Sequence, residues 1–183
     1  VLHQAGGKLS NAIKESYLEE CRKHGVDFFV MYGQTEATAR ISYISGNKLA
    51  QRIQSIGKAI PGGKLSIINA NFDGIGELVY EGLNVSLGNA ENLLELMLPD
   101  INKGYLKTGD LARVDDEGFF YIVGRIKRFA KIRGIRINLE DCENYLMANN
   151  FNGILISQGE SLVYYADMAI DSKRLTHLMQ DFT

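Results

Sequence analysis

Two short polar runs combine residue types that can bind a phosphorylated ligand. The first, at residues 32–36, reads Tyr-Gly-Gln-Thr-Glu, and the second, at 105–110, reads Tyr-Leu-Lys-Thr-Gly-Asp. In the first run, a glycine that permits a tight turn precedes the hydroxyl of Thr35 and the carboxylate of Glu36. A hydroxyl can donate to a phosphate oxygen, and a carboxylate is a ligand that Mg²⁺ prefers. The first run therefore has the groups needed to hold a phosphate together with its metal ion.

A structural role for the same run stays open. Threonine is favoured as the N-cap of a helix, and an acidic residue is favoured in the first turn that follows. Thr35 could therefore cap a helix that begins with Glu36.

The second run places a carboxylate, Asp110, on what its Thr-Gly-Asp sequence predicts to be a tight turn, with Thr108 bracing it. Such a carboxylate is a good acceptor for the two hydroxyls of a ribose. The alternative is an ordinary β-turn of the kind that Asp and Gly form without any ligand.

Two further segments could contact a ligand. Gly6 and Gly7 would let the backbone approach a bound molecule closely, or would simply turn a strand into a helix. Arg125 could place its planar guanidinium on a ribose and phosphate. The basic stretch at 124–137 that it begins also satisfies the alternating polarity of a solvated strand face.

The elements that must position these residues follow from the apolar spacing. Residues 8–24 have a helical period, with Ser10 or Asn11 as cap and Gly25 as stop. Residues 27–32 form a continuous apolar run, which predicts a buried parallel strand covered on both faces. Ligands in α/β sheets bind at the carboxyl ends of such strands.

Short strands and polar turns dominate the middle of the chain, and an α+β tail follows. Strands are expected at 64–68, 76–80 and 118–123, with 111–114 and 119–123 forming a hairpin through an Asp-Asp-Glu-Gly turn. In the tail we expect helices at 139–149, capped by Asn138, and at 171–180, with strands at 154–157 and 161–165 between them.

Composition excludes several classes of partner. The 183 residues include 20 basic and 22 acidic side chains, a net charge of −2, which gives no electrostatic reason to expect nucleic acid or a membrane surface as partner. Cys21 and Cys142 are the only cysteines and have no histidine at metal-ligand spacing. We therefore expect free thiols in a reducing, cytoplasmic compartment, and no signal peptide or membrane-spanning run.

Taken in order, the three runs at 32–36, 105–110 and 124–127 resemble the nucleotide-handling half of the adenylate-forming (AMP-binding) enzymes. This superfamily includes acyl-CoA synthetases and the adenylation domains that load carrier proteins. The similarity from Gly104 through Arg125 is nearly continuous. It implies ATP or AMP and Mg²⁺ as cofactors, a carboxylic acid as substrate, and CoA or the phosphopantetheine of an acyl carrier protein as acceptor.

The resemblance also implies roles for single residues. Thr35 would bond the α-phosphate, Glu36 would hold Mg²⁺, and Tyr32 would pack on the adenine. Lys127 occupies the position of the hinge about which the carboxy-terminal lobe swings between the two half-reactions. The other nucleotide-binding positions are Gly6, Gly7, Gly33, Asp110 and Arg125, and those on the thiol-acceptor side are Lys131 and Gly134.

The implied fold is a partial one, a carboxy-terminal portion of the family's architecture. We expect the end of an α/β subdomain at 1–56, a β-rich, β-barrel-like subdomain at 57–126, and an incomplete, small α+β carboxy-terminal lobe at 127–183. The family's phosphate-gripping loop and its catalytic Gly-Lys pair have no counterpart in this sequence. We therefore expect a fragment that is inactive alone and could form a homodimer through the apolar surface that the missing part of the fold would leave exposed. The alternative is a non-catalytic nucleotide- or protein-binding module of the same ancestry.

Overall fold

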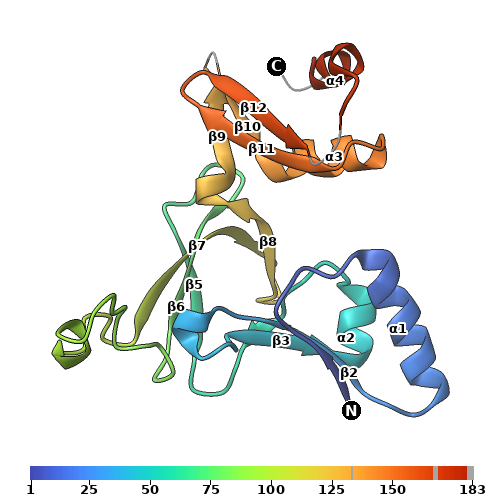
Figure 1. The fold of residues 1–183 in the computed structure, drawn as a ribbon. Coiled ribbons are helices and arrows are strands. Elements are labelled where there is room, and N and C mark those ends of the chain that lie inside the picture. Colours follow the sequence, from blue (N-terminus) through green and yellow to red (C-terminus); the bar gives the residue numbers. More distant parts are fainter. Residues whose placement is uncertain (133, 167–168, 181–183) are drawn as a thin grey trace. The chain divides into compact units, whose positions relative to one another are not determined.

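A computed structural model describes residues 1–132, 134–166 and 169–180 (Figure 1). The chain divides into two units, Val1–Val123 and Gly124–Thr183. Both units combine small sheets with few helices.

The first sheet of the first unit has the order β1-β2-β3-β4. Its strands are β1 (Leu2–Gln4), β2 (Phe28–Tyr32), β3 (Ser42–Ser45) and β4 (Lys58–Ala59). β1 and β2 are parallel, whereas β3 runs antiparallel to both β2 and β4. The expectation of a buried parallel strand covered on both faces is therefore wrong in part: β2 has one parallel neighbour, and only Phe28 and Val30 of its residues are fully buried.

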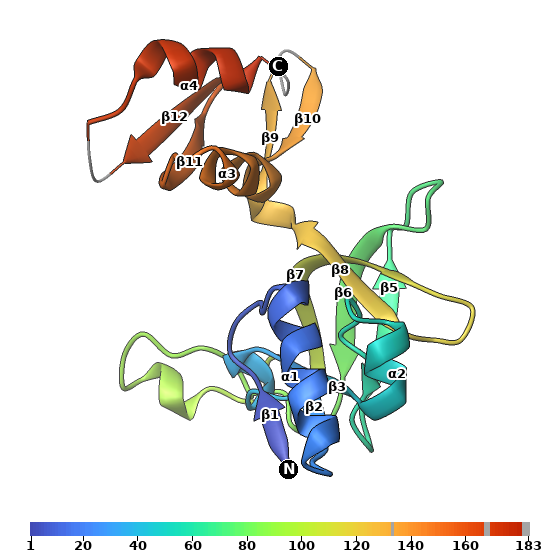
Figure 2. The same ribbon diagram turned by 90° about the vertical axis from the view of Figure 1, so that its right-hand side faces the viewer.

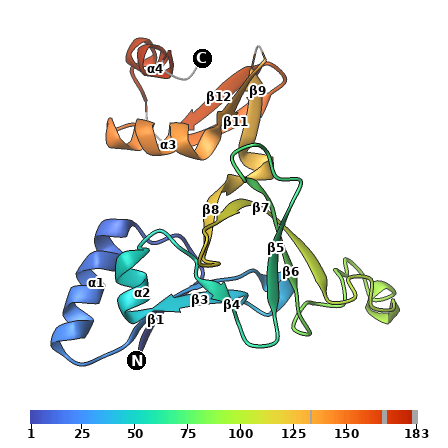
Figure 3. The ribbon, with the colours of Figure 1, turned by 180° about the vertical axis from the view of Figure 1, so that it is seen from behind.

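Two helices cover one face of this sheet, and Figure 3 shows α2 beside β3 with α1 next to it. α1 (Asn11–Lys23) begins at the predicted cap, Ser10, whose hydroxyl accepts from the amide of Ile13. α2 (Gly46–Gln51) follows β3 directly. The buried residues that the helices and the sheet contribute to one core are Leu18, Cys21, Phe28, Val30, Ile44 and Leu49, and Phe119 from outside these elements packs into it.

The second sheet is an antiparallel meander, β5-β6-β7-β8 (Figure 2). Its strands are β5 (Lys64–Ile68), β6 (Gly76–Glu81), β7 (Tyr105–Val114) and β8 (Phe120–Arg125), the last of which continues into the second unit. The predicted hairpin between β7 and β8 is confirmed, since the amide of Asp115 donates to the carbonyl of Phe119.

The Thr-Gly-Asp run does not form the predicted tight turn. β7 continues through it, and Leu78 of β6 faces a bulge because Val79 pairs with Lys107 while Glu77 pairs with Leu111. Gly109 has φ +72°, a conformation that glycine adopts without strain. The expected turn is thus a bulge inside a long strand. The run forms a bulge because β6 pairs with β7 on both sides of it.

In its described residues, the second unit contains two small hairpins and two α-helices. Its strands are β9 (Phe129–Ile132), β10 (Ile135–Asn138), β11 (Gly153–Gln158) and β12 (Ser161–Ala166), and its helices are α3 (Leu139–Ala148) and α4 (Ser172–Met179). Asn138 caps α3 as predicted, and Asp171 caps α4. Leu146 and Cys142, both fully buried, lie in the core that α3 forms with β9, β10 and β11.

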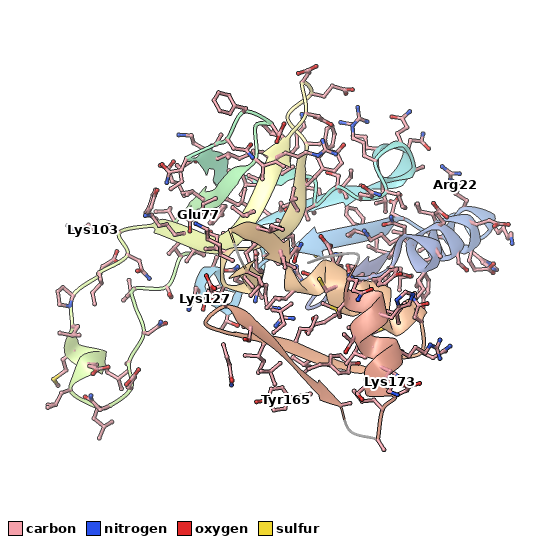
Figure 4. All side chains as sticks on the ribbon, turned by 90° about the horizontal axis from the view of Figure 1, so that it is seen from above. Arg22, Glu77, Lys103, Lys127, Tyr165 and Lys173 are labelled. Carbon is pink, nitrogen blue, oxygen red and sulfur yellow. The ribbon has the colours of Figure 1, made fainter. Side chains whose placement is uncertain are left out.

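A long segment between β6 and β7 leaves apolar side chains in solvent. It contains one short 3₁₀ helix, η2 (Glu95–Met97). Figure 4 shows this segment leading up to Lys103, with its side chains pointing away from the ribbon. Its exposed large apolar residues are Leu83, Leu87, Leu93, Leu94, Leu96, Met97, Leu98 and Ile101.

Asp115 holds the β7–β8 hairpin to α2. Its carboxylate accepts from the amide of Phe119 at 2.8 Å, from the hydroxyl of Tyr121 at 2.9 Å and from Arg52 at 3.4 Å. Burial alone raises the pKa of this carboxyl, but these hydrogen bonds and one from the amide of Glu117 outweigh it and hold the pKa below its ordinary value.

This pKa shift predicts a pH-dependent stability. The ordinary pKa of Asp, about 3.9, applies to the unfolded chain. Because the folded value is lower, the stabilisation is present above that pH and is lost as the pH falls through the folded pKa. We expect Asp115→Asn to lower the free energy of unfolding at pH 7 by roughly 1 kcal/mol, with the difference shrinking below about pH 4.

Urea unfolding between pH 3 and pH 7 measures this difference. Asp116→Asn, at the next and exposed position of the same turn, is the matched control and should leave stability unchanged at every pH. A loss in Asp115→Asn that persists undiminished at pH 3 would contradict the assignment.

Candidate nucleotide site

The first sheet brings two glycine-containing segments to one edge. β1 leads into Gly6 and Gly7, and its parallel neighbour β2 leads into Gly33 and Gln34. The carboxyl ends of parallel neighbours lie at the same edge, where α/β sheets bind ligands. A side chain at Gly6 or Gly7 would meet no atom within 4 Å, so the backbone there borders open space.

A polar cluster joins this edge to the second sheet. The hydroxyl of Tyr32 donates to Asp110 Oδ2 at 2.6 Å. The amide of Gln34 donates to the same oxygen at 3.1 Å and to the carbonyl of Thr108 at 2.8 Å. The two motifs are thus in direct contact although 78 residues separate Tyr32 from Asp110.

The bulge in β7 positions Asp110. Thr108 donates its hydroxyl to the carbonyl of Leu78 at 2.8 Å, and the same oxygen accepts from the amide of Asp110 at 3.1 Å. Thr108 therefore braces the bulge. Asp110 is only 2% exposed, so its carboxylate is buried. A buried carboxylate needs hydrogen-bond donors, and Tyr32 and Gln34 supply them.

Thr35 and Glu36 lie in a short 3₁₀ helix, η1 (Thr35–Ala37), directly after β2. The residue at the N-cap is Gln34, which makes no side-chain capping bond, so Thr35 does not act as the helix cap that the sequence left open. Thr35 is exposed and Glu36 is half-buried. Neither side chain therefore caps the helix.

The loop after β2 depends on one close approach and one anchor. A Cβ at Gly33 would lie 2.2 Å from the carbonyl oxygen of Ala39, so only glycine fits there. Asn84 donates its amide to the carbonyl of Ala37 at 2.7 Å and accepts from the hydroxyl of the buried Tyr80 at 2.7 Å. Asn84 therefore ties η1 to the end of β6.

Sequence reasoning assigned no site role to Gln34 or Asn84. Gln34 lies inside the first motif, but its donor role becomes visible only when Thr108 and Asp110 are placed beside it. Asn84 lies 47 residues from the carbonyl it holds, and no local pattern signals that contact.

The remaining predicted residues belong to the second unit. Arg125 ends β8, and the exposed Lys127 lies in the 3₁₀ helix η3 (Ile126–Arg128) that follows. The exposed Lys131 lies in β9, and Gly134 directly precedes β10. Their neighbour Arg133, part of the same basic stretch, lies outside the described residues.

The donor set fits a magnesium ion brought in with phosphates. Among the described residues, no three His, Cys, Asp or Glu side chains gather as a metal site. Mg²⁺ is commonly held by one or two carboxylates together with substrate phosphates, and Glu36 can supply one.

Both cysteines are buried and unpaired. Burial, with a further contribution from the charge of Asp141, raises the pKa of the Cys142 thiol to about 11, so this thiol is inert at neutral pH. In the parts of the chain that are described, no helix is long and apolar enough to cross a bilayer.

Comparison with known sequences finds acid–CoA ligases. No family model matches the chain. It is 32% identical over 151 residues to the 2-succinylbenzoate–CoA ligase of Staphylococcus epidermidis, a match covering 81% of this chain and 30% of that enzyme. It is 33% identical over 104 residues to a long-chain-fatty-acid–CoA ligase of Rattus norvegicus, covering 56% and 14%. The chain thus spans less than a third of the length of these relatives.

Solved structures agree in fold. The chain superposes on o-succinylbenzoate CoA synthetase from Bacillus subtilis in complex with an acyl-adenylate intermediate, with a TM-score of 0.69, 24% identity, and coverage of 98% of this chain and 39% of that one. The unliganded form of that synthetase gives 0.64 at 25% identity, with coverage of 98% and 40%. Its complex with ATP and magnesium ion also gives 0.64, at 24% identity, with coverage of 100% and 39%. By sequence and by fold, the chain is therefore related to a portion of the adenylate-forming acyl-CoA ligases, as its three motifs predicted.

Proposed function

We propose that this chain is the nucleotide-handling part of a ligase that activates a carboxylic acid with ATP. The activated acyl group would then pass to the thiol of CoA or of a carrier protein's phosphopantetheine. One observation carries the proposal: Tyr32 and Gln34 of the first motif both donate to Asp110 of the second. A buried, oriented carboxylate beside an open glycine edge is what recognition of a ribose requires.

The chain's own residues would bind and orient the nucleotide. Asp110 would accept from the ribose hydroxyls, the ring of Tyr32 would lie on the adenine, and Gly6, Gly7 and Gly33 would let the backbone approach it. The hydroxyl of Thr35 would donate to the α-phosphate. Glu36 would hold Mg²⁺, which neutralises the phosphates when bound.

The first step is an in-line displacement at phosphorus. A carboxylate oxygen of the substrate forms a bond to the α-phosphorus while the bond to the bridging oxygen breaks, and pyrophosphate leaves with that electron pair. Positioning and charge stabilisation supply most of the rate in such reactions. Thr35 and Glu36 lie on the short helix that Asn84 anchors, so their backbone is preorganised for this role.

The second unit would serve the second step. We propose Lys127 as the hinge, Arg125 as a further ligand of the nucleotide, and Lys131 and Gly134 on the side of the thiol acceptor. In this proposal, 1–56 ends an α/β subdomain, 57–126 forms the β-rich, barrel-like subdomain, and 127–183 is an incomplete α+β lobe. The isolated chain would have little or no activity.

The names of the relatives support a carboxylic acid as the substrate that we propose, without indicating which acid. Their names specify 2-succinylbenzoate in one case and long-chain fatty acids in the other. We propose CoA as the acceptor in the first place, with a carrier protein as the alternative. The two free, buried thiols fit the reducing, cytoplasmic compartment that we propose for the protein.

A second candidate function is a protein-binding module of the same ancestry. It is favoured by the apolar segment between β6 and β7, where Leu93, Leu94 and Met97 are each at least 80% exposed. Exposed apolar patches of this kind mark interaction sites. We propose that the chain forms a homodimer through this segment.

Asp110→Asn tests the ribose site. We expect the variant to bind AMP at least roughly tenfold more weakly than the wild-type chain, because it loses charge-assisted hydrogen bonds to the ribose. Isothermal titration with AMP measures the loss. Asp116→Asn is the matched control and should bind as the wild type does, whereas equal binding by Asp110→Asn or no binding by the wild-type chain would contradict the proposal.

Glu36→Gln tests the metal role separately. We expect AMP affinity to stay within about twofold, while the gain in ATP affinity on adding Mg²⁺ disappears, because the amide is a poorer ligand for the ion. Titrations with ATP, with and without Mg²⁺, make the comparison, and Glu15→Gln on the exposed side of α1 is the control. A Mg²⁺ effect of wild-type size in Glu36→Gln would remove Glu36 from the site.

Sedimentation velocity over a range of concentrations tests self-association. We expect a wild-type dimer and a monomer for Leu94→Glu/Met97→Glu, because two charges in an apolar contact are costly to bury. Phe72→Glu is the control, since Phe72 is equally exposed but isolated on the β5–β6 turn. A wild-type chain that stays monomeric at all concentrations would exclude the homodimer.

A further inference from the structure

An open groove of about 380 Å³ lies in the first unit, away from the residues assigned to nucleotide binding. It runs along β3 and β4 and the start of α2, and Phe119 of the β7–β8 hairpin contributes to its wall. None of its lining residues belongs to the polar cluster around Asp110 or to η1. The lining consists of Tyr43, Ile44, Ser45, Asn47, Lys48, Lys58, Ala59 and Phe119.

Two ammonium groups converge on this groove. The Nζ atoms of Lys58 and Lys48 lie 4.7 Å and 5.8 Å from the centroid of the Phe119 ring. No acidic residue is among the lining residues. Within the described part of the chain, neither lysine forms an ion pair. Two like charges at one ring leave a local positive potential in a chain whose net charge is −2.

A third cation at the same ring, Arg52, is already paired with acids. The guanidinium of Arg52 lies 4.5 Å from the ring centroid of Phe119 and forms ion pairs with Asp115 and Glu117. Both acids are already paired with Arg52, and neither of them lines the groove. Neither Lys48 nor Lys58 forms an ion pair with these acids, so the two lysines are the cations that an anion in the groove would meet.

The rest of the lining combines apolar contact with hydrogen-bonding groups. Phe119 and Ile44 are 4% and 3% exposed, so they are fixed by the core and form a rigid apolar base. Tyr43, Ser45 and Asn47 carry a phenol hydroxyl, an alcohol and an amide that can donate to an anion. The groove therefore suits a molecule with one anionic end and one compact apolar end.

We propose that this groove binds a small phosphate monoester with a compact apolar or aromatic organic part. Lys48 and Lys58 would bind the phosphate, and the organic part would lie against Phe119, Ile44 and Tyr43. A phosphate dianion matches two ammonium groups, whereas a single carboxylate would leave one of them unbalanced. The proposal is independent of the nucleotide site and of the reaction assigned to it.

Phenyl phosphate is the probe for this site, and inorganic phosphate and benzoate are the comparison compounds. The ¹⁵N-labelled chain is titrated with each compound, and amide chemical shifts are followed by NMR. We expect saturable shifts with phenyl phosphate at residues 43–48, 58–59 and 119, with a dissociation constant of roughly 1 mM or lower. Inorganic phosphate lacks the ring and benzoate lacks the second charge, so each should bind at least about threefold more weakly.

Removal of the charge, with a polar side chain kept in its place, gives the decisive comparison. We expect Lys48→Gln/Lys58→Gln to weaken phenyl phosphate binding by about tenfold, or about 1.4 kcal/mol. Lys64→Gln is the matched control, because Lys64 is an exposed lysine of the same unit that is paired with Glu81. The proposal is overturned by shifts that do not saturate, by shifts confined to residues 32–36 and 108–110, or by equal binding in the double variant.

Discussion

The contact between Tyr32 and Asp110 is the interaction on which the candidate site depends. A hydroxyl at the end of β2 donates over 2.6 Å to a carboxylate in the middle of β7. These strands belong to different sheets, so the bond fixes one sheet relative to the other at the edge where the glycines leave open space. Gln34 adds two donors to the same junction. Because Asp110 is almost fully buried, its charge is tolerated only while these donors stay in place.

Much of the nearby architecture serves to hold that junction. The bulge in β7 turns Asp110 toward Tyr32, and the hydroxyl of Thr108 completes the backbone bonding that the bulge interrupts. On the other strand, Gly33 lets the chain pass within contact of Ala39, so that η1 can follow β2 immediately. Asn84 then fastens η1 to the end of β6. The bulge, the close approach at Gly33 and the anchor at Asn84 thus hold the backbone in positions that regular strands would not give it.

The first unit contains two polar regions of opposite character. Around Asp110, donors converge on a buried negative charge, whereas at Phe119 two ammonium groups converge on a ring with no acid in the groove between them. The β7–β8 hairpin contributes to both, through Asp110 in its first strand and Phe119 at its turn. Arg52 and Asp115 fix the hairpin to α2 and so hold the second region in shape.

Local pattern alone determined the helices α1, α3 and α4, most strands and the residue types of the site, but it did not indicate α2 (Gly46–Gln51). Caps at Ser10 and Asn138 are readable because a helix end depends on a few neighbouring residues. Three features needed the tertiary structure. The Thr-Gly-Asp run reads as a turn, but its pairing with β6 makes it a bulge. Gln34 and Asn84 find their partners 76 and 47 residues away. Lys48 and Lys58 likewise meet at the ring of Phe119 although they come from separate segments, and no local sequence pattern indicates that they do so. Contacts between distant segments depend on how the sheets pack, and a sequence pattern reports only what neighbouring residues prefer.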